Sequence, residues 1–129
     1  MMKIFKIFII VVFLAVQSAP LIITCNYDKF ASIQKVDAVV EIFQLTFTVD
    51  EETSEAQVLR KNGITDVQLL PTEGGFTFIE VNERGNVLTT TIDKYGKSAH
   101  SRNTILDSEL IPSQFYGKCD YKLYINAFA

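Results

Sequence analysis

The stretch FTFIEVNERGNVLTTTIDKYGKSAHSRNTIL, residues 76–106, decides the fold class of this chain. NERG and DKYG separate its segments of β-branched and aromatic residues, and each places a polar residue (Asn82, Asp93) three positions before a glycine (Gly85, Gly96). This order is typical of a type I turn followed by a left-handed glycine, which closes a three-residue hairpin loop. The stretch therefore predicts three antiparallel strands joined by two tight hairpins.

The same turn signal continues toward the N-terminus. Gly63, Gly74, Gly85 and Gly96 are each eleven residues apart, with strand-like segments between them. Turns at this spacing are typical of antiparallel all-β domains. We expect an all-β fold, a small antiparallel β-meander that forms a sheet or barrel of about 7–8 strands.

The two hairpin loops also fix a strand register, which places Thr90 between Phe78 and His100. Because side chains alternate across a strand, one face then collects most of the large side chains, and we expect it to be the inner face. Its members are Phe76, Phe78, Glu80, Leu88, Thr90, Ile92, Ser98, His100 and Arg102.

This register brings together four candidate binding residues, Glu80, Thr90, His100 and Arg102. In a functional interpretation they form a polar group at the mouth of a pocket. Arg102 binds a carboxylate or phosphate oxygen, Glu80 orients it, and His100 donates a hydrogen bond or carries a proton. In a structural interpretation, Glu80 and Arg102 form a diagonal ion pair and His100 bonds to Thr90. No catalytic residue is assigned.

Other motifs do not predict a cofactor or a metal. TIDKYGKS, residues 91–98, ends like a P-loop but begins with Thr91 instead of glycine, and no helical pattern follows it, so we interpret it as a turn. The acidic DEETSE, residues 50–55, lacks the ligand spacing of a calcium loop and is expected to be a hairpin tip. Two cysteines and one histidine are too few for a zinc shell, and no GxSxG elbow supports a hydrolase.

The N-terminus MMKIFKIFIIVVFLAVQSAP combines two lysines, an apolar run and small residues, which is the order of a secretory signal peptide. We expect residues 1–18 to be the signal peptide and 19–129 a single antiparallel β domain that is periplasmic or secreted. An uncleaved anchor is the alternative. Cleavage changes the formal charge from −3 to −5, so the sequence gives no reason to expect nucleic acid or, after cleavage, a membrane as partner.

Cys25 and Cys119 are the only cysteines. In an oxidising compartment they predict one disulfide that links the first strand to the last, with two free thiols as the alternative.

Between residues 26 and 43 the pattern is ambiguous, and we expect a strand at 21–27, a short helix or irregular link, and then a long strand. The tail after Cys119 alternates and is expected to add an edge strand.

Residues 74–106, with IPSQFYGKC at 111–119, resemble small exported bacterial proteins of unknown function. These proteins share a signal peptide, a β-meander and a last strand that ends in aromatic, glycine, any residue and cysteine, here Tyr116 to Cys119. The resemblance implies export and a bridging role for Cys119, and it implies no activity. A more remote architectural similarity, through Thr24 and Cys25 and a compact barrel, is to periplasmic inhibitors of C-type lysozyme, whose inhibitory loop motif is not found in this sequence.

Two functional hypotheses follow. The first is an exported binding module for a protein or small ligand, one form of which is an inhibitor of a cell-wall-active enzyme. The alternative is a small hydrolase or isomerase that uses His100 with Glu80 and Arg102. The enzyme requires His100 to be accessible in a cleft, whereas the binding module does not.

Overall fold

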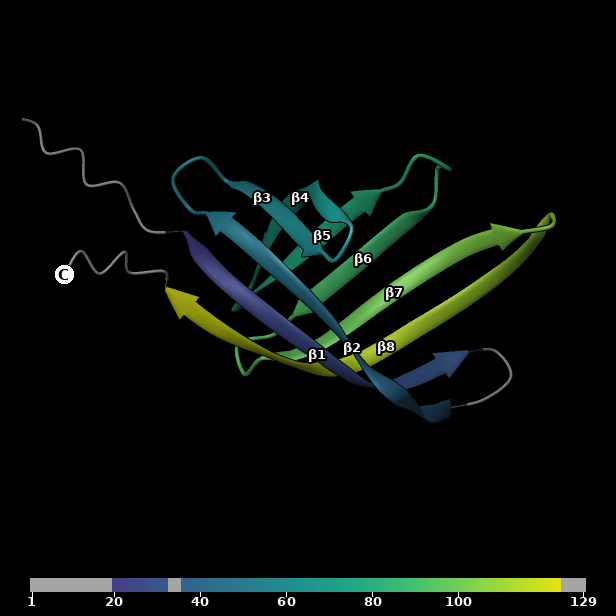
Figure 1. Ribbon diagram of the computed structural model, residues 1–129. Coiled ribbons are helices and arrows are strands. Elements are labelled where there is room, and N and C mark those ends of the chain that lie inside the picture. The colour runs from purple at the N-terminus through teal and green to yellow at the C-terminus, as the bar shows by residue number, and fades with distance from the viewer. Residues whose placement is uncertain (1–19, 33–35, 124–129) are drawn as a thin grey trace, which may run out of the picture.

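The computed structural model of the protein describes residues 20–32 and 36–123, so the predicted signal peptide lies outside the described residues. Eight antiparallel strands form a closed barrel in which each strand pairs with its neighbours in the chain and the last pairs with the first (Figure 1). The strands are β1 (Leu21–Ser32), β2 (Val36–Asp50), β3 (Glu55–Arg60), β4 (Gly63–Thr72), β5 (Gly75–Val81), β6 (Val87–Ile92), β7 (Lys97–Leu106) and β8 (Glu109–Leu123). The predicted all-β meander is confirmed.

The hairpin turns that set the register adopt the predicted geometry. Gly85 and Gly96 have φ angles of 81° and 85°, and the amides of both donate to the first residue of their loop, over 3.0 Å to Asn82 and 3.1 Å to Asp93. The side chains of Asn82 and Asp93 accept further backbone hydrogen bonds inside the loops. The register between β5, β6 and β7 is the predicted one, with Thr90 opposite both Phe78 and His100.

Two expectations about strand ends are wrong. Between Tyr27 and Ser32 there is no helix or irregular link, because β1 continues through a β-bulge and this part of it pairs with both β2 and β8. The segment from Asp120 to Leu123 is not an edge strand, because it continues β8 and pairs with the start of β1. Closure of the ring explains the second difference, since a barrel leaves no edge for a ninth strand. Within the described residues, no helix is long and apolar enough to cross a membrane.

The barrel interior is filled by the inward-facing side chains of every strand. Among the largest fully buried side chains are Tyr27, Phe47 and Phe78, and the rings of Phe47 and Phe78 stack with centroids 4.2 Å apart. The predicted inner face is confirmed, because Phe78, Glu80, Thr90, Ile92, Ser98 and His100 are all buried.

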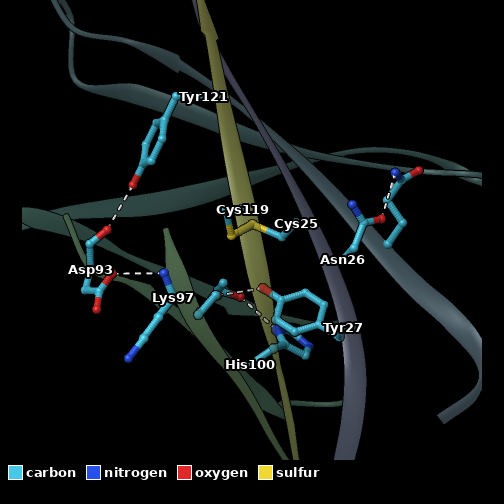
Figure 2. Close-up of a disulfide and its surroundings, with 11 residues drawn as sticks. Cys25, Asn26, Tyr27, Asp93, Lys97, His100, Cys119 and Tyr121 are labelled. Carbon is cyan, nitrogen blue, oxygen red and sulfur yellow. Dashed lines mark hydrogen bonds between the residues drawn. A yellow bond between two sulfur atoms is a disulfide. The ribbon is translucent and has the colours of Figure 1, made fainter. Parts of the chain in front are cut away.

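The predicted disulfide joins Cys25 and Cys119, which lie directly opposite each other on β1 and β8 (Figure 2). It therefore links covalently the two strands whose pairing closes the barrel. In the chain-entropy model, a bridge across so long a loop stabilises the folded state by about 4–5 kcal/mol.

One end of the barrel is open because the strands that reach it differ in length. The β1–β2 and β7–β8 hairpins extend past the ends of β3, β5 and β6 (Figure 1). The last pair between β6 and β7 is Leu88 with Arg102, while β7 and β8 remain paired as far as Leu106 and Glu109. The side chain of Arg102 thus lies where the closed wall stops.

Candidate functional site

The open end of the barrel carries a group of polar and aromatic side chains on the inner face. We call this group the mouth and define it as Phe43, Arg60, Glu80, Arg102 and Phe115. Arg60 is the last residue of β3, Glu80 precedes the last residue of β5, and Arg102 lies beside the start of β6. Because each short strand ends at this level, their final inward side chains meet at one rim.

His100 lies one layer below the mouth and is fully enclosed, with 1% of its surface exposed. Its Nδ1 is 2.7 Å from the hydroxyl of Thr90, which confirms the predicted bond, and the Arg102 Nε–H donates to its Nε2 over 3.4 Å. Since Nε2 accepts a hydrogen bond from Arg102, the ring proton belongs on Nδ1, which donates a hydrogen bond to the Thr90 hydroxyl.

The surroundings of His100 keep it uncharged. Burial, which is the largest cause, and the positive charges of Arg102 and Arg60 together lower the pKa of His100 from 6.5 to about 4. Three aromatic rings enclose it. Their centroids lie 5.9 Å (Tyr27), 5.8 Å (Phe43) and 6.1 Å (Phe115) from the centroid of the imidazole ring. At neutral pH this histidine is a neutral hydrogen-bonding group inside a packed wall.

Arg102 is the polar group that the mouth presents. Its guanidinium carbon lies 5.0 Å from the ring centre of Phe43 and 5.3 Å from that of Phe115, which is cation–π geometry. Burial lowers its pKa, the charge of Arg60 adds to this, and Glu80 opposes it. The group stays charged at neutral pH, because a free guanidinium loses its proton only above pH 12.

Glu80 and Arg102 do not form the predicted ion pair. Glu80 instead binds Arg60 through two parallel hydrogen bonds of 2.7 and 2.6 Å, with the two side chains 11% and 24% exposed. A bidentate carboxylate–guanidinium pair uses both oxygens of Glu80, so it is a better partner than a diagonal contact along the sheet.

Sequence reasoning missed Arg60. The strand EAQVLR does contain a signal, since Ala56 and Val58 are buried and alternation places Arg60 on the same inner face. Its contact with Glu80 spans from β3 to β5 with β4 between them, and a hairpin register does not reveal such a contact.

Below His100 the polar groups are satisfied inside the barrel. The hydroxyl of Tyr27 lies 2.9 Å from the hydroxyl of Ser98, and burial raises the pKa of Tyr27 to about 12 (Figure 2). An internal cavity next to Phe47, Phe78 and His100 measures about 10 Å³. That volume holds one water molecule at most, so this cavity is too small for a ligand.

The mouth is suited to binding an oxyanion. Among the residues whose side chains the structure describes (20–31 and 43–122), His100 is the single hydrogen-bond partner of Arg102, and that bond uses only Nε. The two Nη groups are therefore available as a fork for a carboxylate or phosphate, and the cation–π contacts with Phe43 and Phe115 restrain the guanidinium. Within the same described part of the chain, no group of histidine, cysteine and acidic side chains is arranged to hold a metal.

Comparisons with known proteins do not assign the chain to a family. No protein-family model matches the chain, and neither the curated proteins nor the solved structures contain a match.

Proposed function

We propose that the protein is an exported binding module whose mouth recognises a carboxylate or phosphate group on a protein or small ligand. The observation that carries this proposal is the arrangement of Arg102, whose guanidinium makes cation–π contacts with Phe43 and Phe115 and donates a hydrogen bond through Nε to His100. A preorganised guanidinium loses less conformational entropy on binding than a flexible one, which favours recognition. The Cys25–Cys119 disulfide is consistent with an oxidising compartment.

The geometry gives less support to a hydrolase or isomerase that uses His100. A general acid or base must reach the substrate and titrate near the working pH. His100 is 1% exposed, and its pKa is lowered to about 4. Both of its ring nitrogens already have partners, Thr90 and Arg102. These contacts make it a positioning residue for Arg102 in our proposal.

Benzoate is a suitable probe of the mouth, because its carboxylate matches the guanidinium fork and its ring can pack beside Phe115. Nitrogen-15 NMR should show the Arg102 Nε–H signal moving on titration. Arg102→Gln should abolish the binding, whereas Arg84→Gln, at an exposed arginine in the β5–β6 loop, should leave it unchanged. Unchanged binding in Arg102→Gln, or no movement of the Arg102 signal in the wild type, would reject the proposal.

The natural partner can be sought with the same variants. Immobilised mature protein should retain a component of a periplasmic or secreted extract that benzoate elutes. Arg84→Gln should retain the same component, and Arg102→Gln should not. A component held equally by all three proteins would show that the mouth is not its binding site.

A further inference from the structure

A second charged feature lies on the outer wall of the barrel, on the opposite face of the sheet from the mouth. It is a hollow of about 500 Å³ between β1, β7 and β8. We call it the lysine pocket, and its lining side chains include three exposed lysines and one exposed aspartate. The residues around it are Asn26, Asp28, Lys29, Lys97, Ser98, Tyr116, Gly117 and Lys118.

The backbone itself forms this hollow. The ladders from β1 to β2 and from β1 to β8 both shift register between Tyr27 and Lys29, so Asp28 sits in a β-bulge. Opposite the bulge, β8 approaches so closely that a side chain at Gly117 would overlap the carbonyl oxygen of Asn26. Glycine is required here by this close approach, and bulges of this kind redirect neighbouring side chains.

The charges in the lysine pocket are arranged unfavourably when it is empty. Lys97 and Lys118 lie directly opposite each other on β7 and β8. The neighbouring pair is hydrogen-bonded, because the Cys119 amide donates to the Gly96 carbonyl over 2.7 Å. Since such pairs alternate in an antiparallel ladder, Lys97 and Lys118 form the closer, non-hydrogen-bonded type, with Cα atoms about 4.5 Å apart. Like charges placed directly opposite destabilise a sheet.

Little in the surroundings offsets this repulsion. Neither Lys97 nor Lys118 forms a salt bridge with a residue whose side chain the structure describes (20–31 and 43–122). Asp28 is the one acidic side chain in the lining, in a chain whose formal net charge is −3. Three lysines that converge on one hollow of an acidic protein therefore form a local concentration of positive charge.

We propose that the lysine pocket binds a small soluble ligand through a multiply charged phosphate or pyrophosphate group. The ammonium groups supply charge and several donors to an oxyanion, as lysines do in other phosphate sites. Tyr116 borders the pocket with 39% of its surface exposed, and its ring offers an apolar surface to the part of the ligand that carries the phosphate. Binding relieves the repulsion between Lys97 and Lys118, so the ligand should stabilise the folded protein.

Inorganic pyrophosphate is the probe for this site, with calorimetry and thermal unfolding as the readouts. Lys118→Gln should raise or preserve the melting temperature of the free protein, because it removes the repulsion from Lys97. The same variant should weaken pyrophosphate binding by about tenfold or more, the factor expected for one lost charge-assisted hydrogen bond, and reduce the thermal shift accordingly. Lys97→Gln should repeat this pattern.

Lys122→Gln is the matched control, since Lys122 is an exposed lysine on the same strand outside the pocket. It should bind pyrophosphate like the wild type. No thermal shift with pyrophosphate in the wild type, or an equal shift in Lys118→Gln, would overturn the proposal.

A further experiment tests whether the lysine pocket binds a soluble ligand or a lipid headgroup. Vesicles of phosphatidylcholine with and without phosphatidylglycerol should both leave the protein in solution. Binding to the anionic vesicles that depends on Lys118, without binding of pyrophosphate, would replace the soluble ligand with a membrane surface. Because the mouth is also proposed to bind phosphate, pyrophosphate binding is measured in Arg102→Gln as well, and the part of the binding that depends on Lys118 should be retained there.

Discussion

Gly96 and Gly85 provide a matched pair for testing how tightly the closing strands are packed. Both occupy the same position of a three-residue hairpin loop, and their φ angles of 85° and 81° are nearly equal. They differ in their surroundings. A Cβ added at Gly96 would lie 2.5 Å from the carbonyl oxygen of Cys119, whereas a Cβ at Gly85 would meet no atom within 4 Å.

Gly85→Ala should cost only the strain of a left-handed alanine, about 1–2 kcal/mol of unfolding free energy. Gly96→Ala carries the same strain and in addition displaces the backbone of Cys119. That backbone cannot move freely, because Cys119 is bonded to Cys25 and its amide donates to the Gly96 carbonyl over 2.7 Å. Forcing an extra methyl into such a site costs about 1–3 kcal/mol, so Gly96→Ala should be the more destabilising change by that amount.

Urea unfolding of the oxidised protein, followed by circular dichroism, measures both costs on the same scale. The comparison removes the strain common to both positions and isolates the contact with β8. Equal destabilisation by the two substitutions, within about 0.5 kcal/mol, would refute the reasoning. It would mean that the loop at Gly96 is not packed against the strand that closes the barrel.

Three other predictions concern the ion pair, the histidine and the disulfide. Arg60→Met should destabilise the fold by about 2–4 kcal/mol because it leaves Glu80 unpaired in a largely buried position, and Arg60→Met with Glu80→Leu should recover most of that loss in urea unfolding. The pKa of His100 is about 4 in the folded protein and 6.5 in the unfolded chain, so the unfolded state binds the proton at a higher pH than the folded state does. Stability should therefore fall by about 3 kcal/mol as pH drops from 6.5 to 4, and His100→Gln should lose this part of the pH dependence. Non-reducing mass spectrometry of the mature protein should give a mass two hydrogens below the dithiol, and two alkylatable thiols would contradict the Cys25–Cys119 bond.

The features that the sequence predicted are those with local causes. Asn82 with Gly85 and Asp93 with Gly96 determine their own loops, and each loop fixes the pairing of the strands on either side. His100 could therefore be placed opposite Thr90 from spacing alone. The disulfide was predictable for a different reason, since two cysteines allow only one pairing.

The features that the sequence did not predict depend on closure of the barrel. Arg60 meets Glu80 only because β3, β4 and β5 curve around a common interior. The β-bulge at Asp28 has no sequence signal of its own, because the close approach that accompanies it involves Gly117 on a strand far away in the chain. The role of Lys118 opposite Lys97 likewise appears only when β7 and β8 are paired.

The pKa of His100 tests most directly whether the group below the mouth is a structural support or a catalytic acid or base. His100 is the only histidine in the sequence, so its ring signals in NMR are assigned without ambiguity. A titration should give a pKa of about 4, with the proton on Nδ1 and no change between pH 6 and 8. A pKa near 6.5, together with a ring proton that exchanges rapidly with water, would contradict the buried, neutral histidine on which the binding-module account rests.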